Sequence, residues 1–451
     1  MNKIQEKRIV LCSGIRTPIG HLSRSLSHIP PEHLIKETII TLLSHTSLYP
    51  HAVDGMMLGW VGQGSHAPNL ARIAVLLAGL PEKAHATTIQ ENCVSGIEAV
   101  CSAVRHIVMG EGELYLAGGV ESMSTFPYAI RGSRSAKSLR SLDMLKKNWG
   151  ALWEDPEVKI TDCMEEGLTD PVKNLSMAAT AEVCAQMYSI SRKEQDAYAF
   201  ESFKRALLGQ ENGFYDSHVF PYSEEGQPEI LKRDESPQLR ADLVKKPEMI
   251  GKAPLLFDSC QMSIEQFYRV YGAHILGKRY QAGKTEGTVT LFNSCARSDG
   301  AAVIIVASEK RARELNLDIL AEVRGWGFWG NNPAHMGISP VFATQLALDR
   351  AGVRFDDLDS IELHEAFAAT CLSIFKVGKE KYGQNWQDKW NHGVINPHGG
   401  SIALGHPLAA TGTRIILNTL YQMKLNHKRL GLATACAAGG LGGAIIVEKY
   451  V

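Results

Sequence analysis

The sequence GIEAVCSAVRHI at residues 96–107 leads into ELYLAGG at residues 113–119, and these two segments indicate the fold. The first has the apolar spacing of an amphipathic helix, and the second is a short apolar run that ends in two glycines, as in a buried strand. GTRIILNTLYQM at residues 412–423 leads into LGLATACAAGG at residues 430–440 in the same way. The spacing from helix to strand agrees within about two residues, which indicates a duplicated unit.

Apolar runs and amphipathic segments alternate on both sides of these two units. Such alternation predicts α/β layers. Strands are expected at residues 9–12, 113–117, 320–327, 360–363, 430–435 and 444–447, and helices at residues 31–44, 69–78, 95–109, 340–351 and 411–423.

The middle of the chain has a different texture. Residues 126–285 are richer in charge and show no regular strand pattern, with one clear helix expected at residues 192–208. The following segment, GTVTLFNSCARSDGAAVIIVA at residues 287–307, is expected to form a strand, a turn and a second strand. We therefore expect a first half at residues 1–125 that is completed by residues 286–308, an inserted loop or lid domain at residues 126–285, and a second half at residues 309–451.

Composition excludes several classes of protein. The 47 Lys and Arg residues against 48 Asp and Glu residues give a net charge of −1, so no global charge attracts a nucleic acid. No run of about 20 apolar residues is present to form a transmembrane helix. The start, MNKIQEKRIV, lacks the apolar segment of a secretory signal, and none of the nine cysteines forms a CxxC pair. The expected location is the cytoplasm, where thiols stay reduced.

Two candidate reactive residues lie where a strand gives way to a helix. Cys93, in ENCVSG, precedes the helix at 95–109, where free backbone N–H groups are expected to lower the pKa of its thiol and to bind an oxyanion. His364, in HEAF, ends the strand at 360–363, and such junctions collect the sites of α/β proteins. The alternatives are a buried structural cysteine and a surface histidine beside a helix-capping acid.

Two further candidates lie in glycine-rich turns. His406 ends the segment GGSIALGH at residues 399–406, just before Pro407, which is suited to start a helix. Cys436 lies in ACAAGG, where a strand runs into a turn. A turn with an incidental histidine and a small buried cysteine are the alternatives. Together, however, two thiols and two imidazoles among small residues are the set that acyl transfer requires: a nucleophile, its base, a second acid/base and oxyanion donors.

With these motifs the sequence resembles the thiolase family over nearly its whole length. The matching segments are VLCSGIRTPIG at residues 10–20, ENCVSG at 91–96, GGVESM at 118–123, MAATAE at 177–182, HEAF at 364–367, residues 399–412 and CAAGG at 436–440. The resemblance implies an α/β fold with a duplicated five-layer α-β-α-β-α core and an inserted loop domain. It also implies coenzyme A as a co-substrate, with no metal and no other cofactor.

The resemblance assigns roles to individual residues. Cys93 matches the nucleophile that becomes acylated, and His406 the histidine that activates it and helps to bind the thioester oxygen. Cys436 matches the acid/base that moves a proton at C2 of acetyl-CoA. His364 occupies a catalytic position that holds Asn in many members and His in others. The backbone N–H groups of Cys93 and Ala438 are expected to form an oxyanion hole.

Substrate-binding residues are also implied, although the chain departs from the family near several of them. Met177, Arg240, Cys295 and Phe367 are the expected contacts to coenzyme A or the acyl group. Ser176 stands where the short-chain biosynthetic branch has His, and Arg240 lies two residues further from its acidic neighbours than in the family. The stretches at residues 252–284 and 376–392 are longer than their family counterparts.

His364, CAAGG and the sequence after His406 are similar to the β-subunit branch of fatty-acid-oxidation complexes. The expected activity is thiolytic cleavage of 3-ketoacyl-CoA in fatty-acid metabolism, by an acetyl-CoA C-acyltransferase that works as a homodimer or homotetramer. That branch also implies a hydratase/dehydrogenase α-subunit as a partner. A biosynthetic acetoacetyl-CoA thiolase, a decarboxylating ketoacyl synthase and a non-catalytic relative that binds CoA or lipid are the alternatives.

Overall fold

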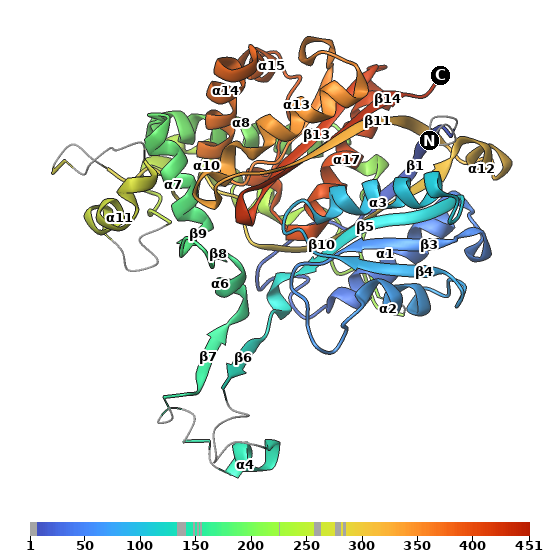
Figure 1. Ribbon diagram of the computed structural model, residues 1–451, viewed down its shortest axis with the longest axis horizontal. Helices are drawn as coiled ribbons and strands as arrows, with labels where there is room; N and C mark the ends of the chain where they lie inside the picture. Colours follow the sequence, from blue (N-terminus) through green and yellow to red (C-terminus); the bar gives the residue numbers. More distant parts are fainter. Residues whose placement is uncertain are drawn as a thin grey trace.

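The computed structural model describes residues 7–132, 141–147, 149–150, 153, 156–224, 226–256, 263–275, 281–282 and 286–451. Its centre is a ten-stranded mixed sheet in the order β12-β13-β14-β11-β1-β10-β5-β3-β4, with β2 paired to β10 (Figure 1). The strands are β1 (Ile9–Arg16), β2 (Gly20–His21), β3 (Gly55–Gly59), β4 (His85–Ile89), β5 (Leu114–Ser122), β10 (Ser298–Ser308), β11 (Ile319–Gly330), β12 (Ser360–Leu363), β13 (Leu430–Ala437) and β14 (Leu441–Lys449).

The pairing pattern of the strands occurs twice. In the first half β3 pairs parallel with β5, β5 antiparallel with β10, and β10 antiparallel with β1. In the second half β12, β13, β14 and β11 follow the same sequence of parallel and antiparallel pairings. The two equivalent strands β1 and β11 then pair with each other and join the halves. The predicted duplication is therefore confirmed by the topology.

Helices form three layers around the two halves of the sheet. Two helices, α1 (Pro31–Thr46) and α2 (Leu70–Leu77), cover the outer face of the first half, and α13 (Ser339–Ala351) covers the outer face of the second half. Between the halves lie α3 (Ser95–Met109) and α17 (Leu408–Leu425), each of which contacts strands of both halves. Figure 1 shows α3 on the opposite side of β3, β4 and β5 from α1 and α2. The expected α-β-α-β-α core is confirmed.

Strand β10 shows how a strand between two helix layers contributes side chains to two cores. Alternate side chains of a strand point to opposite faces of its sheet. Ile304 and Val306 accordingly enter the central core with α3, whereas Val303 and Ile305 enter the core beneath α1 and α2. A strand buried on both faces is a continuous apolar run without alternation, as residues 301–307 are.

The region between the halves contains more regular structure than its sequence indicates. The expected helix is α8 (Arg192–Glu211), but short paired strands are also present: β6 (Tyr128–Arg131) with β7 (Lys159–Asp162), and β8 (Thr169–Asp170) with β9 (Leu175–Ser176). Strands β6 and β7 lie with α4 (Leu142–Lys147) in an arm that projects from the body (Figure 1). The division of the chain into domains at residues 125, 285 and 308 stays a prediction.

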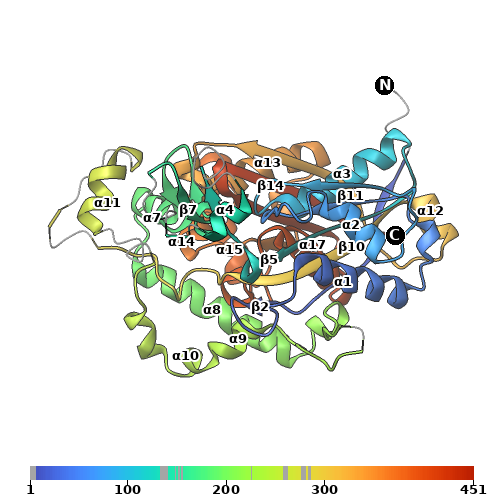
Figure 2. The same cartoon turned by 90° about the horizontal axis from the view of Figure 1, so that it is seen from below.

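The remaining helices cover the ends of the molecule. Figure 2 shows α8, α9 (Glu235–Leu239) and α10 (Ala241–Lys245) along one side. The stretch at 376–392 forms the end of α14 (Ala368–Tyr382) and α15 (Trp386–Asn391), whereas the stretch at 252–284 lies partly outside the described residues. Among the described residues, no helix is both long and apolar enough to span a bilayer. The others are α6 (Cys163–Gly167), α7 (Met177–Met187), α11 (Ile264–Tyr271), α12 (Glu309–Glu314) and α16 (Ser401–Leu404).

The expected strand–turn–strand at residues 287–307 is half wrong. Only its second part is a strand, β10, and residues 287–297 form a loop. The Asn293 side chain accepts from the N–H of Thr290 and donates to the carbonyl of Thr288, and the Ser294 hydroxyl donates to the carbonyl of Thr290. Side chains that bond to nearby backbone in this way compete with the ladder of a sheet.

The two central helices touch at a pair of glycines. A Cβ atom on Gly412 would lie 2.6 Å from the nitrogen of Ile97 and 3.0 Å from the Cα of Gly96. A Cβ atom on Gly96 would in turn lie 2.6 Å from the nitrogen of Thr413. The backbones of α3 and α17 can approach this closely only because neither residue has a side chain.

We expect Gly412→Ala to destabilise the protein by about 1–3 kcal/mol, because the new methyl group must push the two helices apart. Gly330→Ala is the matched control, since no atom lies within 4 Å of the added methyl there. Thermal or urea unfolding of both variants measures the difference. Equal stability of the two variants would contradict this view of the crossing.

Candidate active site

Cys93 lies in a tight turn between β4 and α3. The hydroxyl of Ser95 donates to the carbonyl of Asn92, at 2.6 Å, and accepts from the N–H of Glu91, at 2.8 Å. Asn92 has a positive φ of 52°, a backbone conformation that Asn tolerates better than most residues. Its side chain donates to the carbonyl of Ala438, at 3.1 Å, and so ties the turn to the second half. The turn therefore holds Cys93 against the end of β13.

His406 contacts the Cys93 thiol directly. Its Nε2 lies 3.1 Å from Cys93 Sγ, and its Nδ1 lies 2.7 Å from the hydroxyl of Thr411. That hydroxyl has the carbonyl of Pro407 as an acceptor, at 3.5 Å, so it can accept the proton of Nδ1. In this tautomer Nε2 carries a lone pair toward the thiol, which suits a general base.

His364 completes a compact group with these two residues. Its ring centroid is 4.2 Å from that of His406, and one ligating atom from each of Cys93, His364 and His406 lies within 4.8 Å of the others. Nδ1 of His364 is 2.8 Å from the Ser401 hydroxyl, whereas Nε2 is buried and has no hydrogen-bond partner among the described residues. A buried ring nitrogen without a partner next to the thiol is suited to a substrate atom.

This group has the residue types of a metal site, but its spacing is that of a hydrogen bond. A tetrahedral zinc ion would hold a sulfur and a nitrogen about 3.5 Å apart, and the Cys93–His406 contact is shorter, at 3.1 Å. The donor set therefore fits proton transfer between thiol and imidazole better than metal ligation.

The expected low pKa of Cys93 is wrong. Burial raises the pKa of the Cys93 thiol to about 12, and the N–H groups of Ala438 and of Cys93 itself only partly offset it. Burial, with a contribution from the charge of Arg414, lowers the pKa of His406 to about 3. These two backbone N–H groups favour the thiolate, but desolvation of its charge outweighs them. Both shifts favour a neutral thiol and a neutral imidazole in the resting pair.

Cys436 lies at the end of β13 and is 1% exposed. Burial raises the pKa of its thiol well above the ordinary value, and the nearby thiols of Cys93, Cys371, Cys184 and Cys295 raise it further. Its neighbours in the core are the apolar residues Phe367 and Met177 among others. A thiol that stays protonated here can donate a proton to carbon.

Two backbone N–H groups lie at the Cys93 sulfur. Those of Ala438 and Cys93 both interact with the thiol and stabilise its charged form. These are the two groups expected to form the oxyanion hole, and N–H groups that favour a negative sulfur would also favour a negative oxygen on a carbon bonded to it.

The loop at residues 288–295 carries Cys295 to the same place. The Cys295 N–H donates to the carbonyl of Ala366, at 3.0 Å. Burial lowers the pKa of Arg240, and the nearby Cys295 thiol partly offsets this shift. Arg240 donates to the carbonyl of Leu291 in this loop, at 3.0 Å. Phe367 bridges Ser294 of the loop, so Cys295, Arg240 and Phe367 all lie around it. Met177 starts α7 and packs against the cluster that contains Phe367.

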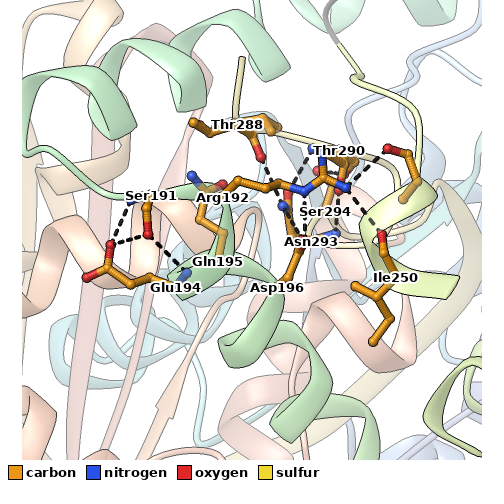
Figure 3. A network of polar contacts seen from close by, with 12 residues as sticks. Ser191, Arg192, Glu194, Gln195, Asp196, Ile250, Thr288, Thr290, Asn293 and Ser294 are labelled. Carbon is orange, nitrogen blue, oxygen red and sulfur yellow. Dashed lines mark hydrogen bonds and ion pairs between the residues drawn. The ribbon is translucent and has the colours of Figure 1, made fainter. Parts of the chain in front are cut away.

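Two carboxylates from the middle of the chain, the half-buried Asp196 and the fully buried Glu182, fix this loop. Asp196 on α8 accepts from Asn293, at 2.9 Å, and from Arg192, at 2.7 Å, and Arg192 also donates to the carbonyl of Ile250 (Figure 3). Glu182 on α7 accepts from the N–H groups of Thr288 and Val289. The region between the two halves therefore positions one wall of the site.

Several residues that support the site were not singled out from the sequence. Glu365 is fully buried and accepts from Ser202, Asn396, Tyr198 and the N–H of Ile402, so it joins α8 to α16 beside His364. A carboxylate within an apolar motif was the available signal for Glu365, and an arginine inside an apolar helix was the signal for Arg414. Ser401 and Thr411, which bond to the two histidines, lie within the motif at 399–412.

Comparisons with known proteins show the family of the chain. The description "Thiolase, N-terminal domain" matches residues 9–246, and "Thiolase, C-terminal domain" matches residues 317–449. A "Probable acetyl-CoA acyltransferase" of Staphylococcus aureus is 34% identical over 449 residues, which cover 98% of this chain and 99% of the relative. Acetyl-CoA acetyltransferase of Bacillus anthracis has a TM-score of 0.81 at 30% identity, over 98% of this chain and 99% of that one. Human mitochondrial 3-ketoacyl-CoA thiolase has the same TM-score at 29% identity and covers 99% of both chains.

Because the resting Cys93 thiol is protonated, we expect its alkylation by iodoacetamide to accelerate as the pH rises from 6 to 9, by roughly tenfold per unit, since the thiolate is the reactive form. Peptide mass spectrometry at timed intervals measures the rate at Cys93 itself. A thiolate–imidazolium pair would instead give a rate that is flat over this range, and that outcome would refute the neutral pair.

Proposed function

The chain belongs to the thiolase family and is an acyltransferase, and we propose that it cleaves 3-ketoacyl-CoA with coenzyme A to acetyl-CoA and a shortened acyl-CoA. The observation that carries this proposal is the 3.1 Å contact between Cys93 Sγ and His406 Nε2, with the buried Cys436 thiol close by. Coenzyme A is the co-substrate, and no metal cofactor takes part.

The first half-reaction breaks the bond between C2 and C3 of the substrate. His406 Nε2 takes the Cys93 proton as Sγ attacks the C3 carbonyl carbon. The oxygen that becomes negative is held by the N–H groups of Cys93 and Ala438. Collapse of this intermediate leaves the acyl group on Cys93 and expels the enolate of acetyl-CoA, whose C2 takes the proton of Cys436.

The second half-reaction restores both thiols. The thiol of coenzyme A gives its proton to the Cys436 thiolate and attacks the acyl carbonyl. Cys93 leaves as a thiolate and regains its proton from the His406 imidazolium. Neutral resting groups suit this exchange, because each proton moves to a partner that the preceding step has just charged.

The remaining expected contacts are part of the same proposal. His364 contributes its unpartnered Nε2 to the substrate oxygen. Met177, Cys295 and Phe367 line the acyl or pantetheine path, and Arg240 contacts coenzyme A. The Asn that many family members have at this histidine's position does not conflict with such a role, since an amide is also a hydrogen-bond donor.

The cellular location, the metabolic role and the oligomeric state are part of the same proposal. The protein acts in the cytoplasm, in fatty-acid β-oxidation, as a homodimer or homotetramer, with a hydratase/dehydrogenase α-subunit as a further partner. The position of β4 at the edge of the sheet supports a dimer built on the first half, because an edge strand offers unpaired backbone groups.

A biosynthetic acetoacetyl-CoA thiolase is the second candidate, favoured by the match to an acetyl-CoA acetyltransferase. Steady-state thiolysis of 3-ketoacyl-CoA substrates of four to sixteen carbons separates the two. We expect kcat/KM to be retained or to rise beyond four carbons. A steep fall after acetoacetyl-CoA would support the biosynthetic enzyme instead.

We expect Cys436→Ser to separate acylation from carbon chemistry. Brief incubation of this variant with acetyl-CoA should still place an acetyl group on Cys93, because His406 and the oxyanion hole are intact. Exchange of solvent deuterium into the acetyl methyl group should be lost, since a hydroxyl is a much weaker acid than a thiol. Peptide mass spectrometry and proton NMR measure the two steps.

Methyl exchange at the wild-type rate in Cys436→Ser would remove Cys436 from the mechanism and favour a decarboxylating ketoacyl synthase. An acyl adduct on Cys436 rather than Cys93 in the wild-type protein would overturn the assignment of the nucleophile. Absence of any adduct would favour a non-catalytic relative.

A further inference from the structure

Behind His364 lies a buried chain of polar groups that the proposed mechanism does not use. Arg414, on α17, is 1% exposed, and its Nη2 donates to the hydroxyl of Ser401, at 2.6 Å. The same hydroxyl lies 2.8 Å from Nδ1 of His364. The chain Arg414–Ser401–His364 therefore runs from a buried cation to the ring whose other nitrogen is buried and has no hydrogen-bond partner among the described residues.

The available donors and acceptors determine which atom donates in each of these two hydrogen bonds. A guanidinium can only donate, so the Ser401 oxygen accepts from Arg414. In the described part of the protein, the Ser401 hydroxyl has one other neighbour to which it can give its proton, Nδ1 of His364. If Nδ1 carried a proton instead, the buried hydroxyl would lose its acceptor, which is costly.

The direction at Ser401 determines what His364 presents to the substrate. A neutral imidazole has one N–H, so a ring that accepts at Nδ1 carries its proton on Nε2. His364 stays neutral, because burial, His406 and Arg414 all lower the pKa of its ring. Among the described residues Arg414 has no carboxylate at ion-pair distance. The carboxyl of Glu362 still interacts with the charge of Arg414, and this charge contributes to lowering the pKa of the His364 ring.

We propose that Arg414, through the Ser401 hydroxyl, positions His364 as a neutral Nε2–H donor to the substrate thioester oxygen. This is the opposite tautomer from that of His406, whose Nδ1–H donates to Thr411 and whose Nε2 accepts. One of the two adjacent rings thus donates to the oxygen, while the other takes the thiol proton. Arg414 and Ser401 are positioning residues, and the inference rests on the thiolase activity proposed above.

A purely structural role offers a competing account, since the Arg414–Ser401 bond also ties α16 to α17. A double-mutant cycle with His364→Asn distinguishes the two accounts. Asn donates through an amide, and this donor does not depend on a tautomer. In the His364→Asn background Ser401 therefore has no ring tautomer to determine. A structural role would persist in both backgrounds.

The cycle compares Ser401→Ala in the native background and in the His364→Asn background, with methyl deuterium exchange and thiolysis as readouts. We expect Ser401→Ala to slow both rates by about tenfold in the native background, part of the cost of losing an oxyanion donor. In the His364→Asn background we expect less than about a twofold change. Ser373→Ala is the matched control, because this buried hydroxyl donates only within α14, to the carbonyl of Ala369.

Native rates in Ser401→Ala, or equal losses in both backgrounds, would overturn the proposal. If Ser401→Ala does not fold, Ser401→Cys preserves the volume with a poor donor and is expected to change the rates in the same direction.

Nitrogen-15 NMR of the histidine-labelled native enzyme shows directly which ring nitrogen of His364 carries the proton. The signals of His364 are identified as those missing from the His364→Asn variant. A proton on Nε2 is expected, and a proton on Nδ1 would refute the proposal. An inactive native protein would instead refute the proposed function.

Discussion

The backbones of α3 and α17 touch where Gly96 meets Gly412, and the geometry of the site depends on this contact. Cys93 lies two residues before α3, and His406 lies two residues before α17. Because both reactive residues immediately precede the first turn of their helix, the distance between the helices sets the distance between sulfur and imidazole. A side chain at either glycine would separate the helices, and the contact of 3.1 Å between Sγ and Nε2 would lengthen with them.

The site works with neutral groups, although charged residues lie close behind it. Burial holds Cys93 and Cys436 as thiols and both histidines as free bases. In such a setting hydrogen bonds decide which atom donates and which accepts, and each lone pair or proton is directed by a neighbour such as Thr411 or Ser401. Catalysis then relies on preorganised donors that stabilise the negative charge that develops in the transition state. Such stabilisation is usually the largest single contribution to the rate enhancement of an enzyme.

The sequence was sufficient for the parts of this structure that repeat or alternate. The helix–strand pairs at residues 96–119 and 412–440 predicted the duplication, and the turns around Cys93 and His406 marked two residues that the fold brings into contact. It was not sufficient for the pKa of Cys93, since the local helix terminus favours a thiolate and only the packed tertiary structure reveals the larger cost of burial. The prediction of a strand within residues 287–297 was wrong for a related reason. The apolar alternation there suits a strand, but the side chains of Asn293 and Ser294 bond to the backbone of Thr290. Ser401 and Arg414 lie thirteen residues apart in sequence, and only the fold brings them to His364.

Duplication also explains why the two halves can carry different chemistry. Equivalent strands β1 and β11 pair at the centre, so the equivalent helices α3 and α17 face each other, and the turns before them converge. One turn carries a thiol and the other an imidazole, which no single copy could bring together. The strands β5 and β13, which follow α3 and α17 in the chain, also end in residues with different chemistry. Near the end of β5, the carboxylate of Glu121 accepts from the N–H groups of Gly62 and Ala409 and so supports the start of α17, whereas the end of β13 carries Cys436. The two copies of one scaffold thus end these equivalent strands differently. One ends with a carboxylate that helps to hold the site together, and the other with the thiol to which the proposed mechanism assigns the proton on carbon.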